Sequence, residues 1–218
     1  MSTLKNHNLV AVMGGTFDPI HHGHLRSALE LRQLLGLSEV RLLPCHQPTH
    51  RDHPGADSQQ RLTMLQLATE NEPGLEVDTR EINLDQPSYS VYTLKSMRQE
   101  LGKEAVLCWV LGVDAFAAFT HWHQWQLILE LANLIVITRP GFELDENSAE
   151  YQLWQEKQID HQTLSEHVSG KIIPVRLPSQ LEISATFIRD QLKTKQSARY
   201  LLPENVLNYL ENQGLYRE

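Results

Sequence analysis

Cysteine is scarce in this chain of 218 residues, which contains only Cys45 and Cys108. Cys45 lies in a polar stretch with prolines, and Cys108 lies inside an apolar run. A disulfide framework needs several paired cysteines at regular spacings, so this usage argues against one. We therefore expect a protein of a reducing compartment, the cytoplasm.

Long apolar runs are also missing. No stretch approaches the roughly 20 apolar residues that a membrane-spanning helix requires. The short apolar run near the N-terminus stops at Gly14 and Gly15 and lacks the longer apolar region of a signal peptide. We expect a globular protein that is neither secreted nor partnered with a membrane.

Basic residues are outnumbered, with 19 Lys and Arg against 27 Asp and Glu, which gives a net charge of −8. A general binder of nucleic-acid backbone needs clustered Lys and Arg, because its affinity comes largely from released counterions. We therefore expect no nucleic-acid partner. An anionic ligand must be held locally, by a few well-placed groups.

Short β-rich runs alternate with longer stretches of helical spacing, a pattern that predicts a parallel sheet flanked by helices. Helical spacing appears at residues 25–35 and 62–68 and from Ser90 to Gly102. After a polar excursion at residues 145–170, helices should follow Ser184 and Pro203. We predict one domain, residues 1–218, with a Rossmann-like, doubly wound α/β fold, helices on both faces and a helical C-terminal segment. The expected strands are residues 8–13, 39–43, 75–79, 105–111, 134–138 and 171–175.

The stretch MGGTFDPIHHGH, residues 13–24, lies where the first expected strand ends and a helix begins. Such a junction seats phosphate well, because a helix N-terminus offers unpaired N–H groups and the positive end of its dipole. Gly14 and Gly15 permit close approach of the backbone, and Thr16 adds an N–H and a hydroxyl. A P-loop would place Lys-Ser or Lys-Thr after its last glycine, and this chain does not. Some group other than lysine must meet the phosphate charge.

His21 and His24 are the candidates for that group. They are three residues apart, so a helix that begins near His21 places them side by side on one face. Gly23 leaves that face uncrowded. Two other interpretations remain at this stage: an ordinary turn with exposed histidines, and a zinc site, which would lack a fourth ligand at useful spacing.

A second feature follows the fourth expected strand. The end of a parallel strand is where open α/β sheets place ligands, so Gly112 suits close approach and Asp114 suits ribose hydroxyls. Trp122 could stack on a flat heterocycle. Alternatively, Asp114 caps a short helix and Trp122 packs in the core.

A third feature is ISATFIR, residues 183–189, in which Ser184 is a natural N-cap and Arg189 follows about a turn and a half later. A guanidinium at that place can reach a polyphosphate as a fork of donors. Arg139, just past the fifth expected strand, is placed similarly. Either arginine alone could equally be a solvated surface residue.

Together these motifs resemble the nucleotidylyltransferase superfamily, with its GGTFDPxHxGH and ISxTxIR signatures. The order of GGTFDPxHxGH, a PxH segment followed by a base, SYT, GxDxxxxxxxW, RPG and ISxTxIR is similar to that of bacterial nicotinate-mononucleotide adenylyltransferases. The similarity runs from Gly14 to the ending NQGLYR, residues 212–217. It implies transfer of the adenylyl group of ATP to nicotinate mononucleotide, giving deamido-NAD and pyrophosphate, with Mg²⁺ accompanying ATP and no metal ligand from the protein.

The resemblance also implies site residues. It assigns catalysis to His21, His24 and Arg189. It assigns ATP binding to Gly14, Gly15, Thr16, Phe17, His21, His24, Gly112, Asp114, Arg139, Ile183, Ser184, Thr186 and Arg189. It assigns contacts with the nicotinate nucleotide to Thr16, His50, Arg51, Tyr89, Ser90 and Trp122.

This chain departs from the family pattern at two places. Residues 44–49 read PCHQPT where the family commonly has Asn residues and a Pro-Pro pair, and Ser90 replaces the usual threonine. Two other functions stay open on sequence grounds. One is a different transferase of the superfamily, such as the phosphopantetheine enzyme, whose chains are typically shorter. The other is a regulatory module that binds nucleotide without turnover.

Overall fold

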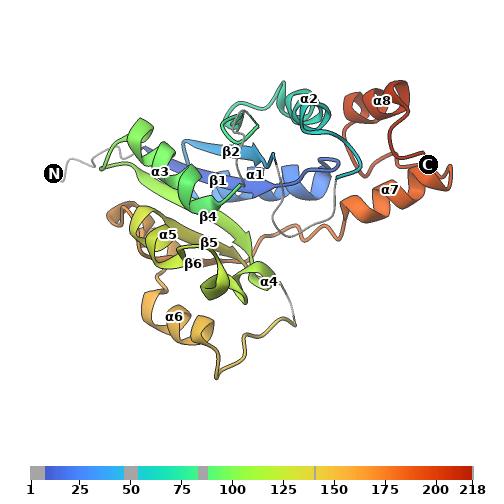
Figure 1. Ribbon diagram of the computed structural model, residues 1–218. Helices are drawn as coiled ribbons and strands as arrows, with labels where there is room; N and C mark the ends of the chain where they lie inside the picture. The colour runs from blue at the N-terminus through green and yellow to red at the C-terminus, as the bar shows by residue number, and fades with distance from the viewer. Residues whose placement is uncertain (1–7, 47–53, 83–87, 140, 218) are drawn as a thin grey trace. The chain divides into compact units, whose positions relative to one another are not determined.

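The computed structural model describes residues 8–46, 54–82, 88–139 and 141–217. Its strands hydrogen-bond in the order β3-β2-β1-β4-β5-β6, and the pairs β1–β4, β4–β5 and β5–β6 are parallel (Figure 1). This is the order of a doubly wound α/β sheet, so the predicted fold class is confirmed. Each expected strand is present: β1 Leu9–Gly15, β2 Glu39–Pro44, β3 Leu75–Val77, β4 Val106–Gly112, β5 Asn133–Ile137 and β6 Ile172–Val175.

The expected helices are present as well. Gly102 ends α3 with φ 81°, as predicted for a C-cap glycine, and Pro203 is the N-cap of α8. In the described part of the chain, no helix has both the length and the apolar content needed to cross a membrane. The helices are α1 His22–Leu35, α2 Ser58–Thr69, α3 Ser90–Leu101, α4 Val113–Phe116, η1 Phe119–His121, α5 Trp125–Leu131, α6 Ala149–Lys157, η2 His161–Glu166, α7 Ala185–Lys193 and α8 Glu204–Gln213.

The chain divides into two compact units, which we describe separately. The first unit contains residues 1–13, 31–40 and 89–177, and the second contains residues 14–30, 41–88 and 178–218. Each unit is assembled from separate stretches of sequence. The strands β1 and β2 each contribute residues to both units. The single domain expected from the sequence stays a prediction.

The first unit is built around β4 and β5, whose residues are almost all buried. Such near-continuous apolar strands are typical of parallel sheets that are covered on both faces. Asn133 is the polar exception in β5, and its side chain is satisfied: Nδ2 donates to the His167 carbonyl at 2.7 Å and Oδ1 accepts from Lys171 N at 3.0 Å. The polar excursion that contains α6 and η2 is thereby fastened to the sheet.

Arg98, in the last turn of α3, fastens several segments of the first unit. Its Nη1 donates to the carbonyls of Gly102 and Ala105, at 3.1 and 2.8 Å. Its Nη2 donates to the carbonyl of Leu131 and, at 3.4 Å, to that of Val168. Burial lowers the pKa of Arg98, and the planar fork of the guanidinium is what allows one side chain to reach so many carbonyls.

We expect Arg98→Ala to lower the free energy of unfolding by about 3 kcal/mol, because it leaves partly buried carbonyls without donors. Arg98→Lys should recover only part of this loss, since an ammonium lacks the fork. Urea denaturation measures both effects. Arg176→Ala, at an exposed position of the same unit, is the control, and an equal effect of the two alanine variants would contradict the role of Arg98.

Candidate active site

The first part of the site is the junction between β1 and α1, in the second unit. The rings of His21 and His24 stack with centroids 3.7 Å apart and planes at 21°. Phe17 is only 3 % exposed and meets the His24 ring edge-on at 5.1 Å. The predicted helix start near His21 and the shared face of the two histidines are therefore confirmed. The buried Phe17 ring therefore helps to fix the His24 ring.

Gly23 is required by the packing of His21. A Cβ at this position would lie 3.0 Å from both Cε1 and Nδ1 of the His21 ring, and 3.5 Å from the Ile183 carbonyl oxygen. A larger residue would therefore push the ring out of its stack. The glycine of HxGH is explained by the crowding of the first histidine.

His21 is buried, at 4 % exposure, and its Nδ1 has no hydrogen-bond partner among the described residues. Burial, and then the charge of the neighbouring His22, lowers the pKa of His21 to about 4. The ring is therefore neutral at pH 7. A neutral imidazole carries one N–H, so His21 can act as a directional donor without a charge of its own.

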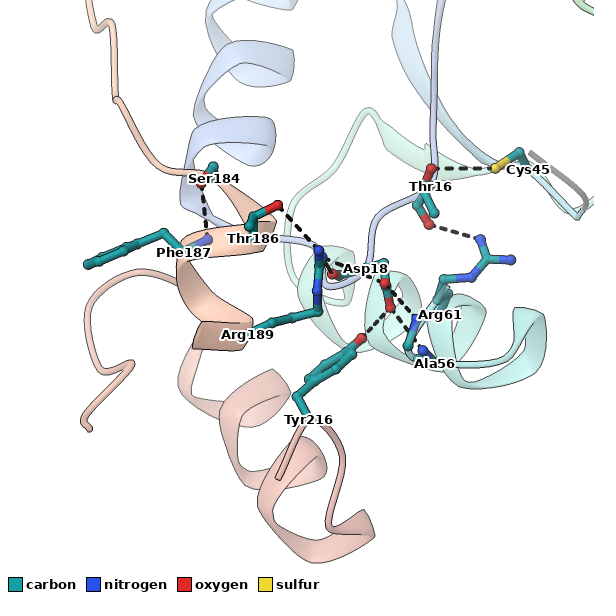
Figure 2. A network of polar contacts seen from close by, with 11 residues as sticks. Thr16, Asp18, Cys45, Ala56, Arg61, Ser184, Thr186, Phe187, Arg189 and Tyr216 are labelled. Carbon is teal, nitrogen blue, oxygen red and sulfur yellow. Dashed lines mark hydrogen bonds and ion pairs between the residues drawn. The ribbon is translucent and has the colours of Figure 1, made fainter. Parts of the chain in front are cut away.

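Asp18 is the centre of a buried polar network (Figure 2). Its Oδ2 accepts from Gly55 N at 2.9 Å. Its Oδ1 accepts from Ala56 N at 3.0 Å and from the Tyr216 hydroxyl at 2.5 Å. The following peptide bond to Pro19 is cis. Sequence analysis named neither Asp18 nor Tyr216 as a site residue, and the separation of these partners along the chain left no local signal.

Arg189 connects the ISxTxIR segment to the same loop. Ser184 is the N-cap of α7, as predicted, and its hydroxyl accepts from Phe187 N at 3.1 Å. Arg189 Nη1 donates to the Asp18 carbonyl at 2.6 Å, and Nη2 donates to Thr186 Oγ1 at 3.2 Å. A guanidinium has five N–H donors, so these two bonds orient it while others stay available for an anion.

Thr16 is fixed by Arg61, a buried residue of α2 that is 1 % exposed. Arg61 Nη1 donates to the Thr16 carbonyl at 2.8 Å, and Nη2 donates to the His46 carbonyl at 3.4 Å. Cys45 Sγ lies 3.8 Å from Thr16 Oγ1, and burial raises the pKa of this free thiol. Sequence analysis missed Arg61, because an arginine in a helix is ordinarily solvated.

Gly112, Asp114 and Arg139 lie in the first unit. Gly112 is the N-cap of α4, and a Cβ there would lie 3.0 Å from Asp114 Oδ1. The alternative that Asp114 is the N-cap of this helix is therefore wrong. The close approach of a ligand at Gly112 stays a prediction. Asp114 Oδ1 lies 3.8 Å from Arg139 Nη1, and both side chains are well exposed. Asp114 and Arg139 are thus available to a ligand.

Two aromatic segments of the first unit lie near each other. Tyr89, the N-cap residue of α3, has its ring 4.6 Å from that of His123. The Tyr92 hydroxyl is 3.2 Å from His123 Nε2. Trp122 is half-buried beside Phe119, with ring centroids 5.6 Å apart. His123, next to Trp122 in the chain, was not expected from the sequence to contact these two tyrosines.

A buried carboxylate holds the segment before Trp122. Glu150, in α6, accepts at Oε1 from the backbone N of Thr120 at 3.1 Å and from its hydroxyl at 2.5 Å. The excursion after β5 thus supports the turn that carries Trp122. Its role was invisible in the sequence, because the two residues are 30 positions apart.

The predicted site residues fall in both units. His50 and Arg51 lie outside the described residues. The second unit contains Gly14, Gly15, Thr16, Phe17, His21, His24, Ile183, Ser184, Thr186 and Arg189, and the first contains Tyr89, Ser90, Gly112, Asp114, Trp122 and Arg139.

The depressed pKa of His21 predicts a pH-dependent stability. Above pH 6.5 the His21 ring is neutral in both the folded and the unfolded state. Between pH 6.5 and 4 the ring is protonated in the unfolded chain but stays neutral in the folded protein. The free energy of unfolding should therefore fall by about 3 kcal/mol across this window because of His21. Urea denaturation at stepped pH measures it. His21→Gln should lose this part of the slope and His22→Gln should keep most of it; equal slopes in wild type and His21→Gln would contradict the assignment.

Comparison with known proteins places this geometry in a family. The cytidylyltransferase-like family model matches residues 12–191, which span both units. Among solved structures, a Plasmodium falciparum nicotinic acid mononucleotide adenylyltransferase complexed with NaAD has a TM-score of 0.69 at 19% identity, over 96% of this chain and 98% of that one. A putative nicotinate-nucleotide adenylyltransferase from Vibrio parahaemolyticus has a TM-score of 0.60 at 18% identity, over 97% and 96%. These likenesses support the fold.

Curated relatives are much more similar in sequence. The nicotinate-nucleotide adenylyltransferase of Salmonella typhimurium is 44% identical over 212 residues, which cover 96% of this chain and 99% of the relative. The probable nicotinate-nucleotide adenylyltransferase of Cellvibrio japonicus is 45% identical over 208 residues, or 95% and 98% of the two chains. The chain therefore belongs to the nicotinate-nucleotide adenylyltransferase family, within the cytidylyltransferase-like proteins.

Proposed function

We propose that this chain transfers the adenylyl group of ATP to nicotinate mononucleotide and releases deamido-NAD and pyrophosphate, a step of NAD biosynthesis. The observation that carries this proposal is an arrangement of donors in the second unit: His21 and His24 stack beside the start of α1, and Arg189 is bonded to the same loop through the Asp18 carbonyl. The family membership supports the same reaction.

The reaction needs no general base. The 5′-phosphate of the mononucleotide attacks the α-phosphorus of ATP, and pyrophosphate leaves. A phosphate monoester has a second pKa of about 6, so this nucleophile is already largely ionised at neutral pH. Catalysis then depends on positioning the two phosphates and on donors aimed at the charge that develops in the transition state.

The donors in this scheme come from the phosphate loop, which is the segment between β1 and α1, from α7 and from the segment after β5. His21 and His24 donate hydrogen bonds to oxygens of the α- and β-phosphates, and Arg189 and Arg139 hold the leaving pyrophosphate. Asp114 binds ribose hydroxyls, and Gly112 allows the nucleotide close to the end of β4. The remaining ATP contacts are Gly14, Gly15, Thr16, Phe17, Ile183, Ser184 and Thr186.

Mg²⁺ enters as part of the substrate Mg-ATP. Within the described ranges, His, Cys, Asp and Glu form no group of three or more that could hold a metal ion. Mg²⁺ commonly binds through substrate phosphates and few protein ligands, so a site rich in phosphate-directed donors suits it. A bound Mg²⁺ would supply positive charge next to the pyrophosphate as it leaves.

The nicotinate nucleotide contacts Thr16, His50, Arg51, Tyr89, Ser90 and Trp122 in this proposal. Ser90 begins α3, so its N–H is one of the unpaired donors of a helix N-terminus. Donors of this kind bind the nicotinate carboxylate and are left unpaired by a neutral carboxamide, which is a strong basis for discrimination between the two substrates.

The low cysteine content supports a cytoplasmic location for the protein.

Pyrophosphate release from Mg-ATP tests the proposed function, with nicotinate mononucleotide, nicotinamide mononucleotide and phosphopantetheine offered separately. We expect release with nicotinate mononucleotide and the formation of deamido-NAD. Release with phosphopantetheine alone would identify a different transferase. Binding of ATP without release in any arm would favour a regulatory module.

His24→Ala should lower kcat about a hundredfold, because one donor to the developing charge is worth on the order of 3 kcal/mol in such sites. Steady-state pyrophosphate release measures the effect. His22→Ala is the matched control, since His22 occupies the variable position of HxGH and should leave turnover near the wild-type value. A folded His24→Ala protein within a few-fold of wild type would rule out the assigned role.

A further inference from the structure

We propose that Tyr216 is a positioning residue for Arg189. Its hydroxyl donates a hydrogen bond to the Asp18 carboxylate, so that the Arg189 guanidinium does not pair with this carboxylate and stays directed toward the ATP phosphates. This role rests on the proposed function, because it concerns the residue that would hold the pyrophosphate. Tyr216 lies in the ending NQGLYR, beyond the segment matched by the family model. The Tyr216 hydroxyl donates to Asp18 Oδ1, and the Asp18 carbonyl accepts from Arg189 Nη1.

The carboxylate of Asp18 is divided among neutral donors. Oδ1 accepts from Ala56 N and the Tyr216 hydroxyl, and Oδ2 accepts from Gly55 N. Arg189 Nη1 is 3.7 Å from Oδ2, too far for a hydrogen bond, and donates instead to the Asp18 carbonyl at 2.6 Å. An arginine and a carboxylate at this range normally form a bidentate pair. Here three neutral donors take three of the roughly four lone-pair positions of the carboxylate, which leaves no room for a bidentate pair.

The backbone after α8 and the space left by Gly55 hold Tyr216 in place. After α8, Gly214 adopts a left-handed conformation and Tyr216 does so too, with φ 66° and 60°. A left-handed tyrosine is unfavourable by about 1 kcal/mol or more, so its surroundings must hold it there. A Cβ on Gly55 would lie 2.9 Å from the Cε1 atom of the Tyr216 ring, so Gly55 leaves the space the ring fills. Figure 2 shows the ring pointing from the C-terminal segment toward Asp18.

The hydroxyl of Tyr216 is also a permanent donor. Burial, and then its hydrogen bond to Asp18, raises the pKa of Tyr216 well above the usual value for tyrosine. The phenol therefore keeps its proton at neutral pH and can donate to Asp18. Without this donor, Oδ1 would be left short of a partner, and the nearest remaining cation is the guanidinium of Arg189. The Arg189 guanidinium would then pair with the Asp18 carboxylate, and fewer of its N–H groups would face the phosphates.

Tyr216→Phe removes the hydroxyl and keeps the ring. We expect kcat/KM for Mg-ATP to fall about tenfold while KM for nicotinate mononucleotide stays within about twofold, because Arg189 faces the leaving pyrophosphate. Assays are run well below the unfolding temperature of each variant. Tyr200→Phe is the matched control, since that tyrosine lies in the same unit, is 89 % exposed and should change neither constant.

A double-mutant cycle separates positioning from simple stabilisation. In an Arg189→Ala background, Tyr216→Phe should cost less than about twofold, because the residue it acts through is gone. Gly55→Ala keeps the hydroxyl but displaces the ring, and should reproduce the loss seen in Tyr216→Phe. A tenfold loss that persists in the Arg189→Ala background would overturn the positioning role.

The wild-type reaction distinguishes failure of this inference from failure of the proposed function. If wild type releases no pyrophosphate with nicotinate mononucleotide, the proposed function falls and this role falls with it. If wild type is active and Arg189→Ala is impaired but Tyr216→Phe matches Tyr200→Phe, only the role of Tyr216 is overturned. Equal effects of Tyr216→Phe on the KM values of both substrates would also overturn it.

Discussion

The second unit depends on the solvation of one buried carboxylate. Asp18 is 6 % exposed, and a buried charge is tolerated only where hydrogen bonds replace lost water. Its donors come from the segment before α2 and from the end of the chain, while α7 is bonded to its carbonyl. The phosphate loop between β1 and α1 is therefore fixed from several directions. Each partner that satisfies Asp18 also fixes the loop between β1 and α1, which carries His21 and His24.

The phosphate loop differs from a P-loop in how it meets an anion. A P-loop relies on a lysine, whereas this junction presents stacked histidines, one of them a neutral donor in the free protein. Neutral donors depend on direction more than on charge, so their geometry must be exact to a few tenths of an ångström. This agrees with the burial of Phe17 and His21, the close packing of the His21 ring against Gly23 and the internal use of Arg61 to fix Thr16.

Much of this fold could be predicted from the sequence, because parallel strands such as β4 and β5 are continuous apolar runs and helix ends carry recognisable caps. The face shared by His21 and His24 could also be predicted from their spacing. The network around Asp18 could not, since its partner Tyr216 is 198 residues away and Arg61 is 45 residues from Thr16. Such pairs follow from tertiary packing, which leaves no periodic trace. The capping role considered for Asp114 failed because Gly112 already ends the strand and begins the helix.

The neutrality of His21 has a consequence for competition inside a cell. A binding site with a strong fixed positive charge collects whatever anion is most abundant, including inorganic phosphate and chloride. Here the buried imidazole contributes none at pH 7, and the charge of Arg189 is partly offset by Asp18 at 3.7 Å. The junction between β1 and α1 therefore attracts small anions only weakly, and selective binding there depends on the directions of its hydrogen-bond donors.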